Sequence, residues 1–125
     1  MTDSHVLEDK SHFRGVWVFL EHRKQGLRDV SVQLIGEARR LADLRDTTLT
    51  GILLGNGVDD LAKYAIGYGL DRVIVVDDPI LEIYRSRPYA QVMAQLIRRQ
   101  KPEIVLYGAS KNGQSPVSEI GRAHV

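Results

Sequence analysis

Short apolar runs alternate along the chain with amphipathic helical stretches, and this alternation limits the folds that the sequence can adopt. Each run is apolar at nearly every position and rich in β-branched or aromatic residues, as in strands that are covered on both faces. The runs span residues 15–20, 48–54, 72–76 and 103–107. Strands and helices that alternate in this way form right-handed parallel βαβ units. We therefore expect an α/β fold of three layers, in which a parallel sheet has helices on both faces.

The segments between the runs show helical periodicity and predict three helices. We expect Ser31 to cap the first helix, Gly69 to end the second, and Pro88 to lie in the first turn of the third. Residues 21–29 are expected to form a loop, and residues 80–87 an irregular or short helical crossover. The apolar positions expected to face the sheet are Leu34, Ile35, Ala38, Leu41, Ala42, Leu61, Ala65, Tyr68, Tyr89, Val92, Met93, Leu96 and Ile97.

The composition excludes several classes of protein. Cysteine is absent, so disulfides, iron–sulfur ligation and thiolate catalysis are excluded. A formal net charge of +1 offers no electrostatic case for nucleic acid, and no apolar run approaches the roughly 18 residues that a membrane helix requires. We expect a cytoplasmic protein of bacterial source, with no nucleic acid partner and no membrane insertion.

Both ends of the chain differ from the central domain. Residues 1–14 mix acidic and basic side chains, and we expect a polar N-terminal extension there. Residues 119–125 read EIGRAHV, the heptapeptide that a widely used sequencing-adapter DNA encodes in frame, although a genuine short tail is the alternative. We expect this tail to be non-native and the partial domain to span residues 15–118. The sheet is then incomplete at the C-terminus, with no strand after Gly113.

The loop after the last apolar run is the first place to look for a site, because ligands of open parallel sheets bind outside the carboxyl ends of the strands. Its weak candidates for cofactor binding are Gly108, Ser110, Asn112 and Gly113. Glycines let backbone N–H groups approach an anion. The sequence GASKNG is, however, neither a GxGxxG motif nor a Walker loop, so a plain turn at the exit of a strand is the preferred interpretation.

Other polar residues at predicted strand ends also have two interpretations. Glu21, Asp77 and Asp78 could perform acid–base chemistry if their pKa values were raised, but solvated carboxylates are preferred. The glycine-rich turn at 55–57 could hold a phosphate, but the acidic pair that follows it would repel one, so a tight turn is preferred.

The remaining side chains predict neither a metal site nor a catalytic residue. Ser110 lacks a nucleophile elbow, and Trp17 and Phe19 are expected in the core rather than against a flavin. Four histidines lack metal-ligand spacing, namely His5, His12, His22 and His124. Four arginines on outward helix faces or ends are expected to be solvated, with a partner surface as the alternative, namely Arg39, Arg40, Arg98 and Arg99.

Six separated segments carry a family resemblance. They are GVWVFLE at 15–21, VQLIGEARRLAD at 32–43, LLGNGVDDLA at 53–62, YGLDRVIVVDDPIL at 68–81, PYAQVMAQLI at 88–97 and KPEIVLYGAS at 101–110. In this order they resemble the N-terminal domain of the electron transfer flavoprotein α subunit. The resemblance implies a Rossmann-like fold of the adenine nucleotide alpha hydrolase type, which packs against a β subunit in a heterodimer.

The resemblance also implies an activity for the complex. Its FAD would accept electrons from acyl-CoA dehydrogenases or related enzymes, as in fatty acid β-oxidation, and pass them to an acceptor. In the family, FAD lies mainly in a C-terminal domain that this sequence does not contain, so we expect no cofactor on this domain. The alternative is a nucleotide-binding regulatory domain of the universal-stress type, although its glycine-rich phosphate loop is missing here.

Overall fold

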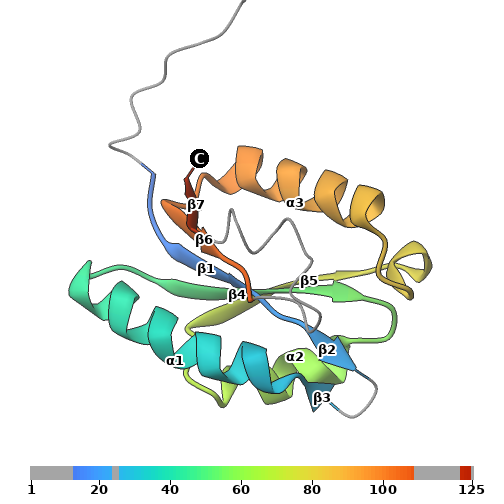
Figure 1. Ribbon diagram of the computed structural model, residues 1–125, viewed down its shortest axis with the longest axis horizontal. Helices are drawn as coiled ribbons and strands as arrows, with labels where there is room; N and C mark the ends of the chain where they lie inside the picture. Colours follow the sequence, from blue (N-terminus) through green and yellow to red (C-terminus); the bar gives the residue numbers. More distant parts are fainter. Residues whose placement is uncertain (1–12, 24–25, 109–121, 125) are drawn as a thin grey trace, which may run out of the picture.

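One parallel sheet organises the computed structural model of the chain, in which residues 13–23, 26–108 and 122–124 are described (Figure 1). Four strands run parallel to one another, namely β1 (Val16–Phe19), β4 (Leu49–Gly55), β5 (Arg72–Asp77) and β6 (Ile104–Leu106). Their order in the sheet is β5-β4-β1-β6. These strands agree with the predicted runs to within one residue at each end, so the prediction of a parallel sheet is confirmed.

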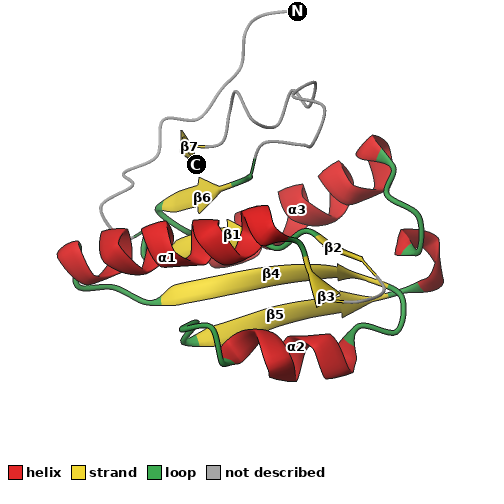
Figure 2. Cartoon of the chain, turned by 60° about the horizontal axis from the view of Figure 1, so that its bottom comes forward, coloured by secondary structure: helices red, strands yellow, loops and turns green. Residues whose placement is uncertain are grey.

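Helices cover both faces of this sheet. The helices α1 (Asp29–Leu44) and α2 (Asp59–Ile66) lie on one face, and α3 (Ser86–Gln100) lies on the other (Figure 1). A single 3-10 turn, η2 (Pro79–Leu81), lies in the expected crossover before α3. Figure 2 shows α2 lying along β5, a strand at one edge of the sheet. The three-layer α/β prediction is therefore confirmed.

Alternation along β1 divides the apolar core into two layers. Val16 and Val18 pack with α1 and α2, whereas Trp17 and Phe19 pack with α3. Trp17 is only 1% exposed, and burial of such a side chain stabilises the fold by about 1.5–3 kcal/mol. The prediction that both aromatic side chains belong to the core is confirmed.

The segment after β1 differs from the predicted loop. It contains a short antiparallel hairpin formed by β2 (His22–Arg23) and β3 (Gly26–Leu27). The helix α1 begins at Asp29, so Ser31 lies buried inside the first turn and does not cap the helix. The N-cap prediction is wrong because the Ser31 hydroxyl bonds to the backbone of Glu21 instead.

The helix α2 is shorter than its apolar pattern suggested. It ends at Ile66, and Tyr68, which was expected on the buried face, is exposed with its ring against that of Tyr64. Gly69 adopts a φ of 115°, a left-handed value that suits glycine and turns the chain out of the helical path. Tyr68 lies beyond the last turn of α2, so its side chain does not continue the buried face of the helix.

The two ends of the domain also correct the predictions. Phe13, which was placed in the polar extension, is buried, and the Arg14 backbone N–H donates to the Lys101 carbonyl. After Gly113, where no strand was expected, β7 (Arg122–His124) pairs antiparallel with β6. Without β7 the outer edge of β6 would present unpaired backbone groups, and a short extended segment can pair with them without an apolar pattern. The expectation of a non-native tail stays a prediction.

None of the helices in the described part of the chain is long and apolar enough to cross a membrane.

Candidate functional site

The strand order places a topological switch between β1 and β6. From β1 the chain moves outward through β4 to β5, and it then returns to the other side of β1 to form β6. The connections that leave β1 and β6 therefore diverge, and ligands of open α/β sheets bind outside the carboxyl ends of the strands at such a point. The candidate site consists of the residues that leave these two strands.

Gly108 leaves β6 and lies against the end of β1. It is buried, and a Cβ at this position would lie 2.8 Å from Cγ2 of Val30 and 3.4 Å from Oε2 of Glu21. A glycine is therefore needed for this close approach of the chain. The structure brings together Gly108 and Glu21, which the sequence singled out separately. The other loop candidates, Ser110, Asn112 and Gly113, lie outside the described residues.

Glu21 is a half-buried carboxylate at the exit of β1. Burial raises its pKa above the usual 4.5, and the Arg28 guanidinium, 3.8 Å away, partly opposes this shift. The Glu21 backbone N–H donates to the Ser31 hydroxyl over 2.6 Å, and that hydroxyl donates back to the Glu21 carbonyl over 3.2 Å. This arrangement fastens β1 to the start of α1, and Glu21 is not the solvated carboxylate that was preferred from sequence.

The backbone of the turn after β4 binds a carboxylate side chain of the same chain. The backbone N–H groups of Gly57 and Val58 donate to the Asp77 carboxylate over 2.8 and 3.0 Å. Gly57 has a φ of 72°, which suits glycine and agrees with the preferred interpretation of a tight turn. Asp77 occupies the donors that a phosphate would need, so this turn does not fit a nucleotide phosphate.

The other strand-end candidates also have structural partners. The Asp78 side chain accepts a 3.0 Å hydrogen bond from the backbone N–H of Ile80, at the start of η2. His22 Nε2 lies 2.9 Å from the Leu54 carbonyl oxygen, which ties the β2–β3 hairpin to β4. Within residues 13–23, 26–108 and 122–124, no group of three or more potential metal ligands comes together.

An aromatic cluster lies on the α3 side of the same carboxyl edge. The Phe19 ring lies 5.6 Å from that of Tyr107 and 6.3 Å from that of Tyr89, and the Tyr84 ring lies 4.7 Å from that of Tyr89. Burial raises the pKa of Tyr107. Sequence reasoning missed Tyr84 and Tyr107 as members of this cluster because Tyr84 precedes α3 and Tyr107 follows β6. Side chains alternate between the two faces of a strand, and this alternation in the last apolar run could have predicted that Tyr107 faces α3.

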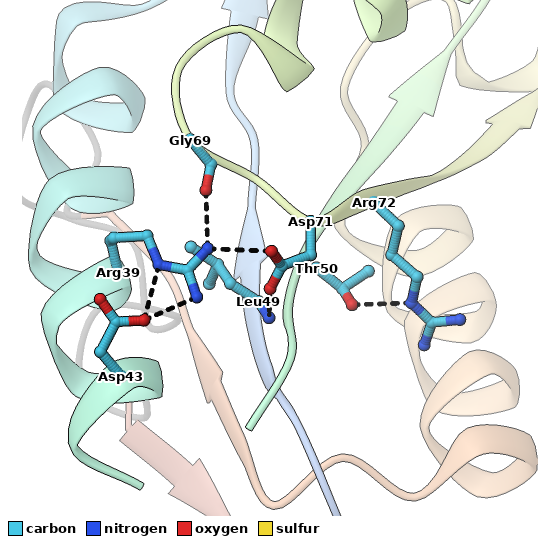
Figure 3. Close-up of polar contacts among 7 residues, drawn as sticks. All are labelled: Arg39, Asp43, Leu49, Thr50, Gly69, Asp71 and Arg72. Carbon is cyan, nitrogen blue, oxygen red and sulfur yellow. Dashed lines mark hydrogen bonds and ion pairs between the residues drawn. The ribbon is translucent and has the colours of Figure 1, made fainter. Parts of the chain in front are cut away.

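A second polar cluster lies at the opposite, amino edge of the sheet (Figure 3). Arg39 donates to the carboxylates of Asp43 and Asp71 and to the carbonyl of Gly69. The Leu49 backbone N–H is the main cause that lowers the pKa of Asp71, with Arg39 adding to it. Arg39 is therefore a structural tie between α1 and the turn before β5, which corrects its interpretation as solvated charge.

The strand order and the glycine contact between β6 and β1 define a doubly wound, parallel α/β domain. The sequence profile of the electron transfer flavoprotein domain matches residues 16–122. The chain belongs to the electron transfer flavoprotein family, as an N-terminal domain of the α-subunit type. The family predicted from the six segments is confirmed.

Several curated relatives are longer than this chain. It is 44% identical over 106 residues to the acryloyl-CoA reductase electron transfer subunit beta of Anaerotignum propionicum, covering 85% of this chain and 29% of that protein. It is 38% identical over 108 residues to the electron transfer flavoprotein subunit alpha of Thermoanaerobacterium thermosaccharolyticum, covering 86% and 33%. It is 35% identical over 113 residues to the lactate dehydrogenase (NAD(+),ferredoxin) subunit LctC of Acetobacterium woodii, covering 90% and 27%. The chain spans about a third of the length of the curated relatives it matches.

Proposed function

We propose that this chain is the structural N-terminal domain of an α-type subunit in a cytoplasmic, two-subunit electron transfer flavoprotein. The observation that carries the proposal is the family match, which extends over residues 16–122. The domain packs against a β subunit, and the assembly carries electrons through FAD from a dehydrogenase to an acceptor. Redox chemistry of this kind belongs to the flavin, while the protein supplies binding and orientation.

The position of the cofactor is part of this proposal. FAD is held mainly by the two-thirds of the relatives' length that lies beyond the match. In support, the described residues do not fit a pyrophosphate at the two strand ends where one would bind. Asp77 occupies the N–H groups of the turn after β4, and the half-buried Glu21 carboxylate lies against Gly108. A phosphate at either place would meet a negative charge.

The electron donor in this proposal is an enzyme of the acyl-CoA dehydrogenase type, as in fatty acid β-oxidation. The relative named as an electron transfer subunit of acryloyl-CoA reductase supports a partner enzyme that acts on a coenzyme A thioester, although a reductase takes up electrons, which is the reverse of the reaction of a dehydrogenase. The relative named as a lactate dehydrogenase subunit indicates that donors differ within the family.

Two measurements test the proposal. The tagged chain, mixed with a purified electron transfer flavoprotein β subunit from the same source, should retain it on an affinity column. In a thermal shift assay, neither FAD nor ATP should raise the melting temperature of the chain, because only a ligand that binds the native state stabilises it. A rise with ATP, without retention of the β subunit, would favour the universal-stress alternative.

A further inference from the structure

The charges along α3 differ between its two ends. From residue 83 to residue 102 the chain contains basic residues but neither aspartate nor glutamate, and the basic residues are Arg85, Arg87, Arg98, Arg99 and Lys101. Asp78 and Glu82 precede the first two of these closely and balance their charge. The last three have no acidic residue beside them in this stretch, so positive charge gathers at the end of α3.

A further cation joins the end of α3 from the edge strand β5. Arg72, the first residue of β5, donates from Nε to the Thr50 hydroxyl over 2.9 Å (Figure 3) and from Nη2 to the Gln100 side chain over 3.2 Å. Both acceptors are neutral, so the guanidinium is held in place and its charge is not cancelled. Lys101 follows Gln100, and its ammonium lies 5.2 Å from the centroid of the Phe13 ring. We define the α3 basic end as Arg72, Arg98, Arg99 and Lys101.

The carboxylates nearest to the α3 basic end in sequence are paired with other cations. Asp71 lies 3.2 Å from the Arg39 guanidinium, and Glu103 forms an ion pair with Arg45. Among the described residues, none of the three arginines of the α3 basic end forms an ion pair with a carboxylate. All three are exposed. The α3 basic end therefore presents positive charge to the solvent.

Stabilisation of the helix explains only part of this cluster. Cations in the last turn of a helix are favourable because the C-terminus of a helix carries a partial negative charge. This effect applies to Arg98 and Arg99, which lie in the last turn of α3. It does not explain Arg72, which belongs to β5 and is held beside Gln100 by a neutral group. Cations that converge from two elements raise the local potential and attract anionic partners from a distance.

The charge on the rest of the chain indicates what kind of anionic partner fits. The whole chain has a formal net charge of only +1, so the residues outside the α3 basic end are negative in sum. A long polyanion, such as nucleic acid or an anionic bilayer, would also meet these negative residues. A protein with a small acidic patch would not. Encounters between electron-transfer proteins have small interfaces, and complementary charges mainly raise their association rates.

We propose that the α3 basic end attracts the electron-donating dehydrogenase through an acidic patch on the surface of that enzyme. The inference rests on the proposed function, in which the assembly receives electrons from such an enzyme. Arginine and lysine side chains are not redox groups, so the α3 basic end changes the rate at which the two proteins meet and not the electron transfer itself. Salt screens this attraction, so it should weaken as the ionic strength rises.

The test removes equal charge from the two ends of the same helix. The double variant Arg98→Gln with Arg99→Gln alters the α3 basic end, and Arg85→Gln with Arg87→Gln is the matched control. Each is placed in the complete two-subunit flavoprotein, and stopped-flow mixing gives the rate constant of association with a purified acyl-CoA dehydrogenase from the same source. The helix is about 22 Å long, so at an ionic strength of about 0.1 M, where the Debye length is about 10 Å, its ends act separately. We expect association to slow about threefold or more in the first variant, and less than about 1.5-fold in the control.

Each outcome of the test has a distinct meaning. Equal rates for the two double variants would overturn the role of the α3 basic end and leave the proposed function intact. A difference that persists at about 0.5 M salt would also contradict the role of charge, because screening should remove it. Failure of the unaltered flavoprotein to associate with the dehydrogenase would overturn both the inference and the proposed donor.

Two further measurements complete the test. Glutamine is a good helix former, so thermal unfolding should show that both double variants keep the fold. Sedimentation with phosphatidylglycerol vesicles examines the membrane alternative. Binding of the unaltered flavoprotein to these vesicles that is lost in Arg98→Gln with Arg99→Gln would assign the α3 basic end to an anionic membrane and contradict the proposal.

Discussion

A Cβ on Gly108 would lie 3.4 Å from Oε2 of Glu21, so the residues that leave β6 and β1 meet at van der Waals distance. This contact joins two connections that are far apart in sequence at the point where the strand order reverses. At the same position, Cγ2 of Val30 lies 2.8 Å from that Cβ and leaves no room for it.

Gly108→Ala should therefore destabilise the fold. The added methyl group would approach Cγ2 of Val30 to 2.8 Å, and overpacking of this kind costs about 1–3 kcal/mol. Urea denaturation gives the free energy of unfolding. The matched control is Gly36→Ala in α1, where a Cβ meets nothing within 4 Å, and this change should stabilise the fold by about 0.5–1 kcal/mol. Equal effects of the two changes would contradict the close approach.

Glu21→Gln should stabilise the chain at neutral pH. Burial raises the pKa of Glu21, so between the usual pKa and the raised pKa the folded state keeps a proton that the unfolded chain has lost. At higher pH the half-buried carboxylate is ionised in the folded state, which lowers the free energy of unfolding. The advantage of the variant should disappear as the pH falls through the raised pKa to below the usual 4.5. Urea denaturation of both proteins from pH 7 downward, at pH steps of about one unit, would measure the difference between their free energies of unfolding. A less stable variant at pH 7 would mean that the Arg28 pair outweighs burial.

Tyr89→Phe should destabilise the segment before α3. The change removes the donor to the Leu81 carbonyl, and a buried carbonyl without a donor costs about 1–3 kcal/mol. Thermal unfolding measures the loss, and hydrogen exchange should show faster exchange at Leu81 and Glu82. The control is Tyr84→Phe, which removes a hydroxyl from an exposed side chain and should change stability by less than about 0.5 kcal/mol.

Asp71→Asn should destabilise the amino edge of the sheet by up to about 1 kcal/mol at neutral pH, as expected for partly exposed ion pairs. The pKa of Asp71 is lowered, so its contribution is present above the usual value of 3.8 and is lost as the pH falls through the lowered pKa. The difference between the two proteins should therefore shrink in acid. Asp46→Asn, at an exposed position, serves as the control, and a difference independent of pH would contradict the role of the charge.

Much of the fold could be predicted from local patterns. The runs that became β1, β4, β5 and β6 are apolar at almost every position because both faces of the sheet are covered, and this requirement is visible residue by residue. The two-residue strands β2 and β3 carry no such pattern. Their pairing depends on where the chain must turn between β1 and α1.

The candidate site was predictable only in part. Gly108 and Glu21 were recognised because each follows an apolar run, and parallel strands bring their carboxyl ends to one edge. Their direct contact, and the roles of Ser31 and Arg28 beside Glu21, depend on β6 lying next to β1. Strand order is a long-range property, and no local pattern encodes it.

By itself, the sequence determined the three-layer α/β class, the parallel strands and the electron transfer flavoprotein family, because burial on both faces and segment identity are local properties of the chain. Only the tertiary structure decided that Asp77 occupies the turn after β4, that Arg39 ties α1 to the turn before β5, and that Ile80, Ile83 and Tyr84 stay exposed. These features arise where elements distant in sequence meet, and the free energy of each contact depends on which groups the fold brings within reach.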